Sequence, residues 1–162
     1  MSRTIKLPIK PALKKYIMKT YDYDPESGPF YVRKHDLIGI ALYSLVSLHK
    51  KLEPAQFNEN VLTEIIELEL CQDIATIGFL VKDAVRLNHI LDKEFKATMH
   101  LFIQAHITNS IPALTGVANF LEFYDVEEAE YSSQSAYRQW LRMSNQEYKK
   151  PAKMGVNRQQ SA

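Results

Sequence analysis

The sequence predicts a mainly helical domain of the α+β class, with about five helices and a small β element. Three observations lead to this prediction. Apolar residues make up 46% of the 162-residue chain, which is typical of a folded domain with a core. Along most of the chain apolar side chains recur at three and four residues, as they do on the buried face of a helix. Two short segments instead alternate apolar and polar residues, which favours strands.

We expect one globular domain over residues 1–150, with an extended basic arm at residues 1–9 and a C-terminal helical subregion at residues 112–150. Residues 151–162 begin with a proline and hold few apolar anchors, so we expect a flexible tail there.

The N-terminal segment predicts a strand and then a helix. Apolar residues occupy every second position of residues 3–9. Pro8 lacks the N–H that a central strand needs, so this segment is either an edge strand or a free arm. A helix is expected from Pro11 to about Tyr21, because proline fits the first helical turn.

The next part of the chain predicts a loop, a core helix and a second strand. Residues 22–34 are rich in turn formers, with a short extended piece at Phe30–Val32. Residues 35–52 predict a mostly apolar helix. Residues 61–70 fit either a helix or a strand, and the alternation in Ile66–Leu70 favours a strand. This strand is expected to pair with the basic arm, within one chain or between two chains, with opposite charges facing each other.

The C-terminal half predicts three helices. The longest covers Lys82–Ile107 and shares the core with the helix at 35–52. A second covers Ala113–Tyr124, and Asp125–Tyr131 forms an acidic turn. The last helix begins at Ser133, and we expect it to end near residue 149, before a proline.

Charge is distributed unevenly, although the net charge of the chain is only +1. Residues 1–20 hold six cations and no carboxylate, and residues 131–162 hold six cations and one carboxylate. The part between them holds 18 of the 19 carboxylates. Two basic ends of this kind indicate contacts with a polyanion, unless they are simply solvated.

A helix, a turn and a cationic helix with aromatic anchors have the layout of a helix-turn-helix DNA reader. Arginine can pair with guanine, and glutamine with adenine, through two hydrogen bonds each. We expect Tyr137, Trp140 and Leu141 to face inward and leave the polar side chains of the last helix outside. The predicted DNA contacts of this helix are Gln134, Arg138, Gln139, Arg142, Lys149 and Lys150.

Two features oppose this interpretation. Glu127, Glu128 and Glu130 would repel phosphates if they faced a duplex. The turn is also longer than the three or four residues of a tight helix-turn-helix. A plain helical hairpin that completes the core therefore stays open as the alternative.

The basic arm and first helix provide a second candidate surface. An extended arm can enter a minor groove, and lysines on a helix can contact phosphates without sequence preference. The alternative is a solvated face. The predicted contacts of this surface are Arg3, Lys6, Lys14 and Lys15.

No pattern points to an enzyme. The chain has no phosphate-binding glycine motif, no nucleophile elbow and no histidine spacing typical of a metal site. We therefore expect neither catalysis, nor a metal, nor a cofactor, nor a small-molecule substrate. Cys71 is the single cysteine, so no disulfide forms within one chain, and we expect a cytoplasmic protein without a membrane segment.

The sequence leads to two functional hypotheses. The first is a non-enzymatic DNA-binding protein, a dimeric regulator or accessory factor of the kind found in phages and mobile elements. The second is a structural or assembly protein that binds protein partners in a larger complex. For the second, an aromatic loop is either an interface anchor or a cover for the core edge. Its residues are Tyr21, Tyr23, Phe30 and Tyr31.

Overall fold

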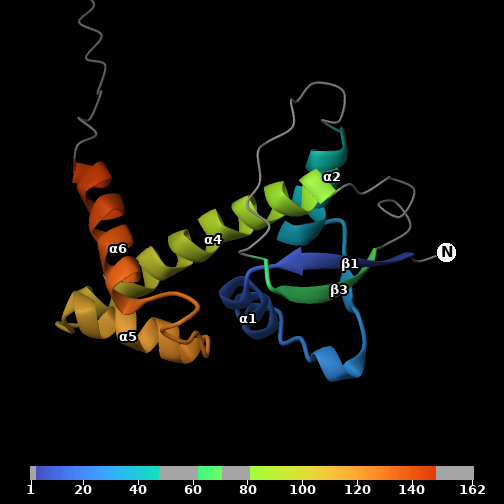
Figure 1. Ribbon diagram of the computed structural model, residues 1–162. Coiled ribbons are helices and arrows are strands. Elements are labelled where there is room, and N and C mark those ends of the chain that lie inside the picture. Colours follow the sequence, from blue (N-terminus) through green and yellow to red (C-terminus); the bar gives the residue numbers. More distant parts are fainter. Residues whose placement is uncertain (1–2, 48–61, 71–80, 149–162) are drawn as a thin grey trace, which may run out of the picture.

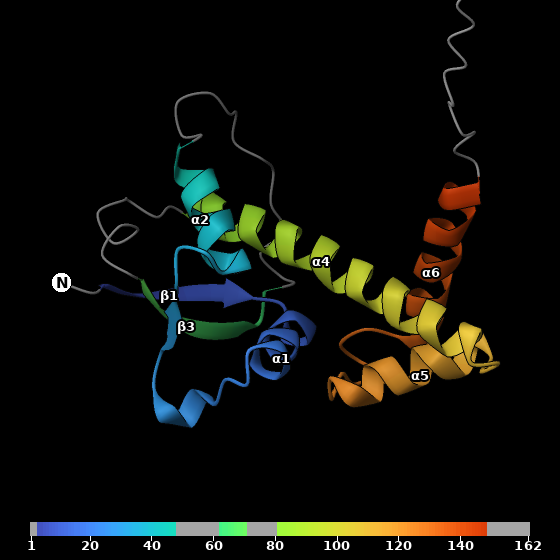
Figure 2. The same cartoon turned by 180° about the vertical axis from the view of Figure 1, so that it is seen from behind.

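The computed structural model describes residues 3–47, 62–70 and 81–148, and its architecture is α+β and mainly helical, as predicted. The helices are α1 (Pro11–Thr20), α2 (Leu37–Ser47), α4 (Val81–Thr108), α5 (Ala113–Phe123) and α6 (Ser133–Tyr148). The strands are β1 (Arg3–Ile9), β2 (Phe30–Val32) and β3 (Glu64–Leu70), and a short 3-10 turn, η1, covers Pro25–Ser27. The sheet and α2 lie toward the N-terminal end of α4, whereas α5 and α6 lie at its other end (Figures 1 and 2).

The sheet joins the N-terminal segment to the acidic strand, in the order β1-β3-β2. β1 runs antiparallel to β3, so the predicted pairing of the arm with Ile66–Leu70 is confirmed and occurs within one chain. Lys6 faces Glu67 across this ladder, with 3.2 Å between ammonium and carboxylate. Leu7 and Ile9 point to the other side and are fully buried. Residues 3–9 are therefore an edge strand that contributes to the core.

Asn88 on α4 fixes the junction between β1 and α1. Its Oδ1 accepts a hydrogen bond from the N–H of Lys10 at 3.1 Å, and its Nδ2 donates to the carbonyl oxygen of Pro8 at 2.8 Å. The same Nδ2 donates to Ala84 within α4. Asn88 is only 3% exposed, so these bonds satisfy backbone groups that are withdrawn from water where the strand ends and Pro11 begins the helix.

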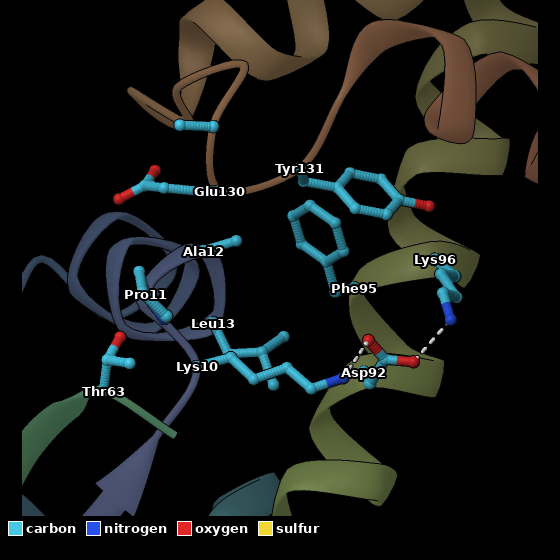
Figure 3. A pocket seen from close by; sticks show the side chains of 11 residues that line it. Lys10, Pro11, Ala12, Leu13, Thr63, Asp92, Phe95, Lys96, Glu130 and Tyr131 are labelled. Atoms are coloured by element: carbon cyan, nitrogen blue, oxygen red, sulfur yellow. Dashed lines mark hydrogen bonds and ion pairs between the residues drawn. The ribbon is translucent and has the colours of Figure 1, made fainter. Parts of the chain in front are cut away.

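An ion-pair group lies beside this junction. Asp92 on α4 accepts from the ammonium of Lys10 at 3.3 Å and from that of Lys96, one turn further along α4 (Figure 3). Burial alone would raise the pKa of Asp92, but the hydrogen bonds and charges of Lys96 and Lys10 outweigh it and lower the pKa. The group therefore ties the start of α1 to α4 as long as Asp92 is ionised.

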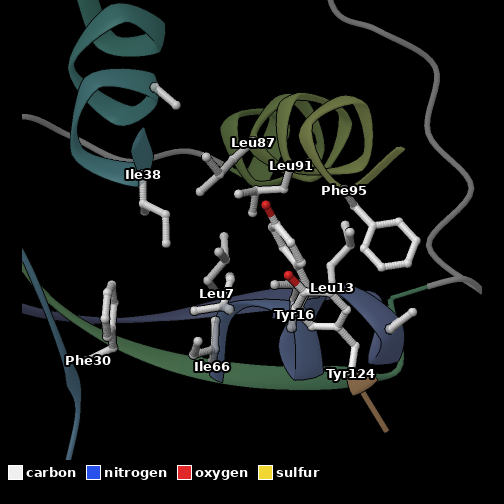
Figure 4. Close-up of a cluster of buried hydrophobic side chains, with 14 of the residues drawn as sticks. Leu7, Leu13, Tyr16, Phe30, Ile38, Ile66, Leu87, Leu91, Phe95 and Tyr124 are labelled. Carbon is white, nitrogen blue, oxygen red and sulfur yellow. The ribbon is translucent and has the colours of Figure 1, made fainter. Parts of the chain in front are cut away.

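The core is continuous along α4. Toward its N-terminal end, Leu87 and Leu91 lie above Leu7 and Ile66 of the sheet (Figure 4). This packing buries the apolar side of the sheet against α4 and provides the main driving force for joining the two.

Phe95 connects the two ends of the core. Its ring lies 5.5 Å from that of Tyr16 on α1, 5.3 Å from that of Phe120 on α5, and 5.7 Å from that of Tyr131 before α6. Phe95 is 2% exposed. Contacts in these tilted and edge-on geometries stabilise beyond the burial of area alone, so one side chain holds three elements together.

α2 corresponds to the helix predicted at residues 35–52, of which residues 48–52 lie outside the described residues. It begins at Leu37 because the N–H of Ile40 donates to the carbonyl oxygen of Asp36, which starts the helical ladder. Ile40 is 52% exposed, while Ile38 and Leu42 are buried. An almost wholly apolar helix gives no clear stripe, so its orientation could not be predicted. No helix among the described residues is both long and apolar enough to cross a bilayer.

Replacing Asn88 with alanine is expected to lower the free energy of unfolding by about 2–3 kcal/mol, because a backbone donor and a backbone acceptor lose their buried partners. Urea denaturation followed by circular dichroism measures this change. Asn145→Ala, at an exposed position of α6, is the matched control and should change stability by less than about 0.5 kcal/mol. Equal effects of the two substitutions would contradict the role assigned to Asn88.

The depressed pKa of Asp92 predicts an acid-sensitive contribution to stability. Its folded pKa lies below its unfolded value, so the contribution is present above about pH 4 and is lost as the pH falls through the folded pKa. The stability difference between the wild type and Asp92→Asn should therefore shrink as the pH falls below about 4. Urea titrations across this range test it, and a difference independent of pH would count against it.

Candidate nucleic-acid interface

α5 packs closely on the end of α4. A Cβ at Gly116 would lie 3.3 Å from the Cβ of His106 and 3.5 Å from a methyl group of Ile103, so the absence of a side chain permits this approach. Val117, on the same face, is fully buried. The first helix of the candidate interface is thus held rigidly on α4.

The connection from α5 to α6 is built as an ordered turn. Asp125 takes a φ of 54°, and the N–H of the following Val126 donates to the carbonyl oxygen of Leu121 at 2.9 Å. This is the way in which a helix commonly ends, with a residue in the left-handed region followed by a buried apolar side chain. Val126 is 7% exposed, so the connection belongs to the core.

Glu128 and Ser132 cap the N-terminus of α6. The carboxylate of Glu128 accepts from the N–H of Ser133 at 2.9 Å and from its hydroxyl at 2.6 Å, which lowers the pKa of this carboxyl. The hydroxyl oxygen of Ser132 accepts from the N–H of Ser135 at 3.2 Å. Both bonds satisfy N–H groups that have no partner within the helix, and a carboxylate is favourable at this end of the helix dipole.

Lys15 on α1 binds the other carboxylates of the turn. Its ammonium lies 2.7 Å from the carbonyl oxygen of Asp125, 2.9 Å from the carboxylate of Glu130 and 3.6 Å from that of Glu127. Burial would lower the pKa of Lys15, but Glu130 and Glu127 outweigh it and raise the pKa. The negative charge that could repel a duplex is thus largely directed at α1 and at the first turn of α6.

α6 has a packed face and an open face. Ala136 is fully buried, and Ser144 shares a hydrogen bond of 3.3 Å with His100 of α4. Tyr137 and Trp140 are half-buried and stack at 5.7 Å. The prediction that Leu141 faces inward is wrong, because it is 37% exposed and lies nearer the open face.

The predicted reader residues lie mostly on that open face. Gln134, Arg138 and Arg142 are exposed and follow one another at four-residue spacing, whereas Gln139 is half-buried at its border. Asn145 shares this face and was not predicted, although its spacing of seven from Arg138 could have indicated it. Among the described residues, neither arginine forms an ion pair, so their guanidinium groups are available to a ligand.

The cations of the N-terminal segment are placed differently. Lys6 pairs with Glu67, Lys14 with Glu64 at 3.0 Å, and Lys15 with the turn described above. Lys6 lies on β1, and β1 and α6 are at opposite ends of α4 (Figures 1 and 2). Lys15 lies on α1 beside the turn before α6, where its ammonium binds the carboxylates of that turn. The side chains of Arg3, Lys149 and Lys150 fall outside the described residues.

The described residues contain no group of three histidine, cysteine or acidic side chains arranged to hold a metal ion. Comparisons of the chain with protein-family models, with curated proteins and with solved structures found no significant match.

Proposed function

We propose that the protein is a non-enzymatic DNA-binding protein whose α6 lies in the major groove. The observation that carries this proposal is the open face of α6, where Gln134, Arg138 and Arg142 follow one another without a carboxylate partner among the described residues. A helix of 16 residues is about 24 Å long, and the major groove is wide enough to admit it.

The spacing of these side chains suits base reading. Residues four apart on a helix are separated by about 6 Å along its axis, which is close to two base-pair steps. Arg138 and Arg142 would each form two hydrogen bonds with a guanine, and Gln134 with an adenine. Lys149 and Lys150, which follow the described residues, are proposed to contact the phosphate backbone of the DNA. The packing of α6 on α4 and α5 supports the proposal, since a reader must be held rigidly.

The N-terminal lysines have a smaller part in this proposal than the sequence alone indicated. Lys6, Lys14 and Lys15 would have to exchange a carboxylate of the protein for a phosphate, and that exchange offsets most of the gain. Their pairing explains why one end of the chain is strongly basic in sequence but contributes little free positive charge. One short reading helix gives limited specificity, which favours a dimer on two half-sites. The proposed setting is a cytoplasmic regulator or accessory factor of a phage or mobile element.

Substituting Arg138 and Arg142 together by alanine is expected to weaken binding to a mixed-sequence duplex by about 10-fold or more, because two charged contacts are lost. Fluorescence anisotropy at two salt concentrations measures this. The slope of the logarithm of the binding constant against the logarithm of the salt concentration should become shallower by about two, because about two fewer counterions are released. The matched control is the pair Arg33→Ala and Lys93→Ala, exposed cations away from α6 whose loss changes the net charge equally. The proposal fails if the folded α6 variant binds as tightly as the control.

A second candidate function, assembly with another protein, is favoured by exposed apolar side chains near the C-terminal end of α4. Leu101 on α4 is 70% exposed and Leu114 on α5 is 59% exposed. The aromatic loop gives less support, because Tyr21 and Tyr23 pack on Phe30 at 5.2 and 5.3 Å, while Tyr31 is 51% exposed. Assembly would then use helical surfaces more than the loop.

This second candidate predicts that the 18.7 kDa chain self-associates or binds its partner through Leu101 and Leu114. Light scattering after gel filtration should show a mass above that of a monomer at micromolar concentration, reduced to the monomer by Leu101→Gln with Leu114→Gln. A monomer at all concentrations would contradict self-association through Leu101 and Leu114.

A further inference from the structure

A cavity of about 400 Å³ lies where α1, α4 and the residues before α6 meet (Figure 3). Its volume is within the range of pockets that hold small ligands. Its lining includes Lys10 and Leu13 at the start of α1, Asp92, Phe95 and Lys96 on α4, and Glu130 and Tyr131 before α6. None of these residues belongs to the open face of α6, so the cavity is separate from the proposed DNA interface.

One end of the cavity is cationic. The ammonium groups of Lys10 and Lys96 both point to Asp92, so two cations share a single carboxylate (Figure 3). Each ammonium carries three N–H donors, and only one of them is used on Asp92. Among the described residues, neither lysine has a second ion-pair partner. The side chains of Lys10 and Lys96 are 37% and 28% exposed, so their remaining donors can be reached from the cavity and from solvent.

The opposite walls are apolar and aromatic apart from Glu130, whose carboxylate accepts hydrogen bonds from the ammonium of Lys15 and the N–H of Glu127, each at 2.9 Å. Leu13 is 1% exposed and Phe95 is 2% exposed. The ring of Tyr131 meets that of Phe95 edge-on at 5.7 Å. Burial and the charge of Asp92 raise the pKa of Tyr131 to about 12, so this wall carries no charge at neutral pH. Such walls favour a ligand with a flat apolar body.

We propose that this cavity binds a small organic carboxylate with a flat apolar body. Its carboxylate lies beside that of Asp92 and accepts hydrogen bonds from the N–H groups of Lys10 and Lys96 that Asp92 leaves free. Its body rests against Leu13, Phe95 and Tyr131. An inorganic anion would leave the apolar walls unfilled, and a neutral aromatic molecule would leave the ammonium donors without an anionic acceptor.

Benzoate is the probe, and the full chain is titrated with it while backbone amide shifts are followed by NMR. We expect saturable shifts at residues 10, 12–13, 92–96 and 129–131, with a dissociation constant of about 1 mM or below for a ligand of this size. Benzamide has the same ring without the charge and should bind at least about 10-fold more weakly.

Lys96→Met should weaken benzoate binding by about 10-fold, because one of two charged contacts is lost. The control is Lys93→Met, an exposed lysine on the same helix that does not line the cavity, and it should bind as the wild type does. Lys10→Met gives an independent check. If Lys10→Met does not fold, Lys96→Met alone tests the proposal. Shifts confined to other residues, no saturation by about 20 mM, or equal affinity of Lys96→Met and Lys93→Met would overturn the proposal.

Discussion

The structure depends on α4, because one helix must serve two different sets of neighbours along its length. Near its start it covers the sheet with Leu87, and near its end it carries α5 against Ile103. At the boundary, Asn88 binds the backbone of the β1–α1 junction and Phe95 contacts three other elements. A helix of 28 residues is about 42 Å long, so the spacing of the two ends is set by the helix itself.

Charge complementarity along the chain is the second organising feature. The basic segment at the N-terminus finds its carboxylates on β3, on α4 and in the turn before α6, through Lys14–Glu64, Lys10–Asp92 and Lys15–Glu130. Each pair is partly exposed, so each contributes modestly to stability. Together they select which segments pair, since a lysine placed opposite another lysine would be unfavourable. A basic end is thus not by itself a sign of an external polyanion.

Much of the fold could be predicted from the sequence, for reasons visible in particular residues. Regular spacing over Lys82–Ile107 predicted the longest helix, α4, and alternation in Ile66–Leu70 predicted β3. Pro8 predicted either an edge strand or a free arm, and β1 is an edge strand. The orientation of α2 could not be predicted, because its apolar residues surround the helix and tertiary packing alone decides that Ile38 is buried and Ile40 is not.

The candidate site was only partly predictable. Helical spacing was enough to place Gln134, Arg138 and Arg142 on one face, since residues four apart share a face of any helix. The partners of the lysines were not predictable, because Lys15 and Glu130 are 115 residues apart and meet only in the folded chain. For the same reason the cavity beside Asp92 has no signature in the sequence, as its walls come from three separate segments.

The topology of β1 has a consequence for synthesis on the ribosome. β1 is made before β3, and their ladder is complete only when residue 70 has emerged, because Arg3 pairs with Leu70. Asn88, which binds Pro8 and Lys10, emerges later still. Until then the nascent strand carries unpaired backbone groups that could bind another chain. Proline and lysine oppose such pairing, so Pro8 and Lys6 protect the growing chain before they serve the finished sheet.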